Sequence, residues 1–294
     1  MPKEKYSDYL KFIDDALELA KALPRYFSKF SNRIYCNHQK LCIYVLMQKL
    51  KTTTRGVISY LHSSSEMRMH LGLTRVPVHT TLVRFLKRIP KYLFQLFSIR
   101  KADTVAVDAT GFELESKSYY YRKVEQGYGR KKTKKFMKLN LAIDTKQRRI
   151  LSYKIRKSRA HESRDFIGLL KDLRVKYVVA DTGYSSKNLR DFVIHKLKAL
   201  PFIPKKKNEG QYHLTPQRIL VFDEKKYHRR SSIENVFSCI KRKYGSVLRN
   251  RTPATQKAEL ISKLVAHNVD ILQHYLTFIF RGLHHRLKQK VLKS

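Results

Sequence analysis

The 294-residue chain is poor in several residue types, and each shortage argues against a class of protein. It has only three cysteines, Cys36, Cys42 and Cys239, without a CxxC pair, so neither a disulfide framework nor a zinc site is indicated. We expect a reduced, cytoplasmic compartment. No apolar run reaches the ~18 residues of a membrane span, and the N-terminus carries acids where a signal peptide would have its apolar core.

Acidic residues are also scarce, because 23 Asp and Glu face 63 Lys and Arg, giving a formal net charge of +40. The basic excess is present in every third of the chain. Positive charge spread over a whole folded protein implies an extended polyanionic partner, and DNA or RNA fits this better than a membrane surface. The hydrophobic content of 42% suffices for a real core, so the chain is not a disordered basic tail. A ribosome-associated protein would have a similar composition, but it would not need the acids discussed below.

The apolar spacing in residues 1–100 predicts only helices. We expect them at 9–23, 38–50, 56–61, 65–71 and 80–89. The segment 52–89 resembles a helix-turn-helix unit, whose last helix carries the candidate DNA-binding residues Arg84, Lys87 and Arg88. A helical bundle with an ordinary basic face is the alternative interpretation.

From Thr104 onward the pattern has the period of strands. Strands are expected at 104–110, 138–144, 150–157, 177–181 and 201–204, and helices at 161–173, 185–197, from 227 onward and at 255–275. The order β-β-β-α-β-α-β-α predicts an α/β fold, a mixed β-sheet flanked by helices.

Three acids occupy positions where such a fold places its chemistry. Asp108 and Asp181 lie at or near the ends of two predicted strands, and Glu234 lies on a later helix. Carboxylates that share a site repel one another unless a cation lies among them, and oxygen-only ligands favour Mg²⁺ or Mn²⁺. Each aspartate alone is more simply a turn former or a helix cap, so only the three together on a basic protein favour catalysis.

The stretch YHRRSSIENVFSCIK, residues 227–241, surrounds Glu234 with cations. On one continuous helix, Tyr227, Arg230, Glu234 and Lys241 would lie within roughly 60° of one another. A solvated charged stripe on an amphipathic helix explains the same spacing. If Ser231 or Ser232 is the N-cap instead, the first two of these residues precede the helix.

These motifs together resemble the DDE transposases of bacterial and archaeal insertion sequences, in particular the group with a Tyr-x2-Arg-x3-Glu-x6-Lys signature. Tyr227, Arg230, Glu234 and Lys241 match that spacing, and VAVDATGF and VVADTGYSS resemble the blocks that carry the two aspartates. The likeness extends over roughly residues 50–275. The short interval between Asp181 and Glu234 leaves no room for the large β-rich insertion of some relatives.

The resemblance implies a ribonuclease-H-like catalytic domain at 101–294, ending in a C-terminal helix, after an N-terminal DNA-binding region at 1–100. Asp108, Asp181 and Glu234 would be both the catalytic residues and the ligands of two Mg²⁺ or Mn²⁺ ions. Tyr227, Arg230 and Lys241 would contact DNA near the scissile phosphate. The implied partners are double-stranded transposon ends and target DNA, bound by a homodimer. The alternatives are a transposase-derived DNA-binding protein that no longer cuts and a metal-dependent nuclease that cuts without joining.

Overall fold

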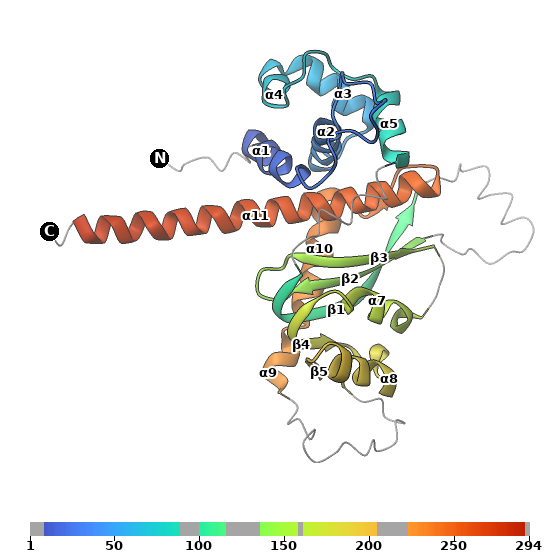
Figure 1. Cartoon of the computed structure of the whole chain (residues 1–294), viewed down its shortest axis with the longest axis vertical. Helices are drawn as coiled ribbons and strands as arrows, with labels where there is room; N and C mark the ends of the chain where they lie inside the picture. The colour runs from blue at the N-terminus through green and yellow to red at the C-terminus, as the bar shows by residue number, and fades with distance from the viewer. Residues whose placement is uncertain (1–8, 89–99, 116–135, 158–160, 205–222, 292–294) are drawn as a thin grey trace, which may run out of the picture. The chain divides into compact units, whose positions relative to one another are not determined.

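The computed structural model describes residues 9–88, 100–115, 136–157, 161–204 and 223–291, without the side chains of residues 162 and 273–291. The chain divides into two compact units, Met1–Leu96 with Ala258–Ser294, and Phe97–Lys257 (Figure 1). Residues 258–294 therefore group with the N-terminal helices, whereas the sequence-based division placed them with the catalytic domain. Within the described residues, no helix is both long and apolar enough to cross a membrane.

The first unit is helical, as the sequence predicts. Its helices are α1 Tyr9–Ala20, α2 Asn37–Lys49, α3 Thr54–Ser63, α4 Ser65–His70, α5 His79–Arg88 and most of α11, which runs over Pro253–Val291. Side-chain caps begin α3 and α4, because Thr53 and Ser64 each accept a backbone N–H three residues later. An ion pair from Lys49 to the buried Asp270 ties α2 to α11. The end of α11 lies well beyond the predicted residue 275.

The second unit is built on one mixed sheet in the order β3-β2-β1-β4-β5, with β6 paired to β1 off this path. The strands are β1 Lys101–Leu114, β2 Phe136–Asp144, β3 Ile150–Arg156, β4 Arg174–Ala180, β5 Leu200–Phe202 and β6 Val247–Leu248. The first three strands are antiparallel neighbours, and β4 and β5 continue the sheet in parallel. The predicted mixed β-sheet of an α/β fold is thus confirmed.

Alternate residues of β1 face opposite sides of the sheet, and helices cover both. Val105 and Val107 belong to a buried core with Phe166 of α7 (Phe166–Leu170) and Leu189 of α8 (Lys187–Asp191). The other face of β1 meets α10 (Ser231–Tyr244), whose apolar residues at i, i+3, i+4 and i+7 from Ile233 are all buried. In Figure 1, α10 passes on one side of the sheet, with α7 and α8 on the other.

A buried polar network fastens the beginning of α7 to the sheet. Asp165 ends the 3₁₀ helix η3 (Glu162–Asp165) and is buried, and its carboxylate accepts hydrogen bonds from Asn140 of β2 and Arg156 of β3. The predicted continuous helix 161–173 is therefore interrupted. The helix predicted at 185–197 likewise begins as α8 and continues as a π-helix, η5, over Phe192–Lys196.

The single helix expected from Tyr227 onward is two helices. A short helix, α9 (Glu224–His228), ends before α10 begins at Ser231, with Arg230 at the N-cap position. Gly245 ends α10 with φ of +87°, a conformation that side-chain-bearing residues seldom adopt, and this turns the chain into β6. Strand β6 was not predicted, because two residues are too few to show a period.

Candidate active site

Asp108 lies within β1 rather than near its end, because the strand continues to Leu114. Its side chain faces α10, is 16% exposed, and accepts a hydrogen bond from the backbone N–H of Ala109 at 2.7 Å. The neighbouring strand explains its accessibility. Parallel pairing of β1 with β4 stops at Val107, and pairing with β6 resumes only at Glu113. Asp108 is therefore the first residue of a gap in strand pairing along this edge of β1.

Asp181 comes directly after β4, and the register pairs Ala180 with Val107. The next residues along the two parallel strands are Asp181 and Asp108, so both aspartates lie at the same point of the sheet. Asp181 Oδ1 accepts the N–H of Gly183 at 2.9 Å and caps the 3₁₀ helix η4 (Thr182–Tyr184). A Cβ at Gly183 would lie 2.9 Å from that same oxygen, so this glycine lets the carboxylate keep its position.

Glu234 is in the first turn of α10, and its side chain is 55% exposed. Arg230 links it to Asp108, because the guanidinium lies 2.8 Å from Glu234 Oε1 and 3.8 Å from Asp108 Oδ2. Burial acts to lower the pKa of Arg230, but Glu234, Tyr227 and Asp108 together raise it above its ordinary value. The structure thus brings two of the predicted acids to one cation, and the third lies beside Asp108 by register.

Lys241 lies about two turns after Glu234 on α10 and also contacts β1. Its Nζ donates to Thr110 Oγ1 at 2.7 Å and lies 5.4 Å from the centre of the Phe112 ring. Thr110 and Phe112 are at two and four residues from Asp108, on the same face of the strand. Sequence reasoning missed Thr110 as a partner, although this alternation from Asp108 would have indicated it.

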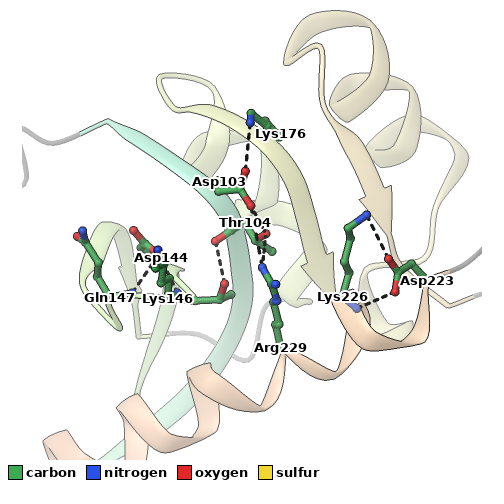
Figure 2. A network of polar contacts seen from close by, with 10 residues as sticks. Asp103, Thr104, Asp144, Lys146, Gln147, Lys176, Asp223, Lys226 and Arg229 are labelled. Carbon is green, nitrogen blue, oxygen red and sulfur yellow. Dashed lines mark hydrogen bonds and ion pairs between the residues drawn. The ribbon is translucent and has the colours of Figure 1, made fainter.

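Tyr227 lies on α9, not on the helix that carries Glu234, and its ring is half-buried. The same approach segment is fastened to the sheet by polar contacts, shown in Figure 2. Arg229 reaches Asp103 at 4.0 Å and donates to Thr104 Oγ1 at 3.5 Å, both near the start of β1. Lys226 pairs with Asp223 at 3.1 Å and lies 4.4 Å from the centre of the Tyr177 ring. No pattern in the sequence indicates these contacts.

The predicted N-terminal DNA-binding residues are on α5 in the other unit. Arg84, Lys87 and Arg88 are all exposed there.

The donor set around Asp108 suits a hard divalent cation, because it consists of carboxylate oxygens. The Arg230 guanidinium stands in for such a cation, since it already offsets the charges of Asp108 and Glu234. In the described part of the chain, no three His, Cys, Asp or Glu side chains are grouped closely enough to hold a metal ion. The carboxylates of Asp108 and Glu234 are therefore chemically suited to a metal ion, and Arg230 already occupies the position of a cation between them. The described residues do not form a complete set of three ligands.

The chain resembles known proteins in sequence family and in fold. Residues 99–269 match the family described as the transposase DDE domain, which spans both aspartates and Glu234. No curated protein sequence matches the chain. Among solved structures, the chain is similar to the piggyBac transposase in a synaptic complex with hairpin DNA. The TM-score is 0.51 at 9% identity, and the match covers 92% of this chain and 76% of the other, which establishes a shared fold. Since the family match takes in more than half of the chain, this protein belongs to the transposase DDE domain family.

Proposed function

We propose that the protein cleaves DNA at the ends of an insertion sequence and joins the freed strand to target DNA. The observation that supports this most directly is the arrangement of Asp108, Arg230 and Glu234 at the gap in strand pairing beside Asp181. Membership of a transposase family supports DNA cleavage and joining as the reaction, and the carboxylates mark where in the fold it would occur. The solved structure of a transposase bound to hairpin DNA is consistent with DNA as the partner.

Asp108, Asp181 and Glu234 would hold divalent ions, Mg²⁺ or Mn²⁺ and two in number. Bound there, such ions would lower the pKa of a water molecule and polarise the phosphodiester. No strand of the described chain pairs with Asp108 on the β4 side, which would let a substrate approach it there. Gly183 would keep Asp181 in place, and the anchors of Arg229 would set the distance of Glu234 from β1.

The cations of the same region would bind the DNA backbone. Lys241 is aligned along β1 from Asp108, so it would contact a phosphate next to the one that reacts. Arg230 would exchange its carboxylate partners for a phosphate when metal and DNA arrive together. Tyr227, on α9, would position the strand by its ring and hydroxyl, so Tyr227→Phe should impair cleavage less than Tyr227→Ala.

The other unit would recognise the transposon end. Arg84, Lys87 and Arg88 are exposed on one short helix, as a DNA-contacting helix requires. In this scheme residues 1–100 select the end, the sheet domain cuts it, and two copies act together as a homodimer on paired ends. Cleavage and strand transfer would take place on chromosomal DNA in the cytoplasm.

The test is cleavage and strand transfer on a labelled end in Mg²⁺ or Mn²⁺, with Asp108→Asn, Asp181→Asn and Glu234→Gln. Each variant should lose both steps and retain end binding, because removing an acid near DNA does not weaken contacts to phosphate. Arg174→Gln, which removes an exposed charge at the start of β4, at the end of the strand away from Asp181, is the control and should cleave. Cleavage by Glu234→Gln would contradict the assignment. Hydrolysis without joining by the unmodified protein would favour the nuclease, and binding without cleavage would favour the DNA-binding protein.

A further inference from the structure

The N-terminal unit contains a hollow of about 390 Å³ that the proposed function does not use. It lies between the segment 27–35, the first turn of α2 and one side of α5. All of its lining residues belong to the same compact unit. The volume falls within the range of sites that take small molecules or single chemical groups of a polymer.

The charge of the hollow is positive. Lys40, Arg84 and Arg88 line it, and none of the described lining residues is acidic. Burial lowers the pKa of Lys40, Cys36 acts in the opposite direction, and the neighbouring Arg88 adds to the lowering. An anion bound there would relieve the repulsion between Lys40 and Arg88. Ser31, Asn32 and Thr81 add hydroxyl and amide groups that can hydrogen-bond to phosphate or to the edge of a base.

Aromatic rings form part of the wall. Phe27 stacks on Phe85 with 5.9 Å between the ring centres, and Lys40 Nζ lies 5.6 Å from the centre of the Phe85 ring. Tyr35 lines the same hollow and is half-buried. Phe85 itself is buried, so the rings of the wall that remain partly accessible are those of Phe27 and Tyr35. Exposed rings next to cations are the combination that binds unstacked bases and their phosphates.

We propose that this hollow binds one unpaired nucleotide of a DNA strand. In a duplex, the neighbouring bases cover both faces of a paired base. Aromatic rings in a hollow can therefore stack only on a base that has moved out of the duplex. The cations would hold the phosphate of that nucleotide, and Tyr35 would stack on its base. This rests on the proposed function in one respect only, that DNA is the polymer bound. It requires neither metal nor cleavage.

The test compares three labelled DNAs of one sequence by fluorescence anisotropy with the full-length protein in EDTA. These are an intact duplex, the same duplex with one unpaired nucleotide, and the single strand. The unpaired nucleotide should tighten binding at least about fivefold over the intact duplex, as expected for one stacked base.

Two pairs of variants, checked for folding by circular dichroism, locate the effect. Arg84→Ala and Tyr35→Leu should remove the advantage of the unpaired nucleotide. Lys87→Ala, a matched charge loss on α5 outside the lining, should weaken all three DNAs equally and keep the advantage. Tyr26→Leu, a half-buried aromatic outside the lining, should also keep it.

Several outcomes would overturn the proposal. One is equal affinity for the intact and unpaired duplexes. Another is loss of the advantage in Lys87→Ala to the same degree as in Arg84→Ala. Tighter binding of a free deoxynucleoside monophosphate than of the unpaired duplex would show that the hollow takes a small molecule instead of a strand. Because all measurements are made without metal, failure of cleavage would leave this result intact, and failure here would leave the proposed catalysis intact.

Discussion

Arg230→Gln should make the isolated protein bind divalent cations more tightly while it weakens the binding of DNA. Arg230 offsets the charges of Asp108 and Glu234, with contacts of 3.8 and 2.8 Å, and an arriving metal ion must displace it or bear its repulsion. Glutamine keeps the length and the hydrogen-bonding capacity of the side chain but removes its charge. The change therefore isolates the electrostatic competition from packing.

The size of the effect follows from the exposure of the two partners. The Glu234 side chain is 55% exposed, and ion pairs four residues apart on a helix contribute only about 0.3–0.5 kcal/mol. Asp108 is only 16% exposed, but its contact with Arg230 is longer, so we assign about 1 kcal/mol to it. Displacing the guanidinium thus costs about 1–2 kcal/mol, and its removal should tighten metal binding roughly five- to thirtyfold.

The measurement is isothermal titration calorimetry of Mn²⁺ into the full-length protein without DNA. Arg174→Gln is the matched control, because it removes an exposed arginine charge at the start of β4, at the end of the strand away from Asp181. It should bind Mn²⁺ as the unmodified protein does. Adding Asp108→Asn to Arg230→Gln should abolish the gain and so locate it at this site. Equal or weaker Mn²⁺ affinity in Arg230→Gln would refute the competition between guanidinium and metal.

Three further changes probe the surroundings of the site. Asp165→Ala should lower the free energy of unfolding by about 2–4 kcal/mol in urea titration, since it leaves a buried amide and a guanidinium without their acceptor; a loss well under 1 kcal/mol would show that the network adds little. Lys241→Met should reduce the slope of log affinity against log salt for the cleaved end by about 1, and an unchanged slope would mean that this lysine contacts no phosphate. Gly183→Ala should slow cleavage at least about tenfold by moving Asp181, with end binding retained. Its control, Gly168→Ala, should cleave normally, because the added Cβ would meet only the end of a flexible lysine side chain. Equal cleavage rates for the two variants would contradict the close approach at Gly183.

The elements of the sheet domain were predictable where the side chains alternate strictly. The pairing of β1 with β4 places Asp108 beside Asp181. This proximity could not be predicted, because the sequence does not show which strands are neighbours. The sequence left open whether one helix runs on from Tyr227 or a serine caps a later start. The structure has the later start, but Arg230 occupies the N-cap position instead of Ser231 or Ser232, and its side chain does not cap the helix. Local spacing favoured a continuous stripe, and the structure divides it between two helices.

The partners of the predicted cations were beyond sequence reasoning. Arg230 and Lys241 match a spacing, but spacing along the chain does not reveal that one meets Asp108 and the other Thr110, more than a hundred residues earlier. The hollow beside α5 was hidden for the same reason. Its cations come from two helices, and its rings come partly from an irregular segment that has no period to detect.

The two residues of β6 have a mechanical consequence for α10. The chain from α9 through α10 to β6 is attached to β1 at both ends, by Arg229 at Thr104 and by the pairing of Val247 and Leu248 with Glu113 and Leu114. Strand, helix and attachments form a closed loop. A helix attached at only one end can swing away from the sheet, whereas a helix attached at both ends can mainly shift along its axis or rotate about it. We therefore expect the backbone at Glu234 to move relative to β1 mainly by small rotations or shifts of α10 along its axis.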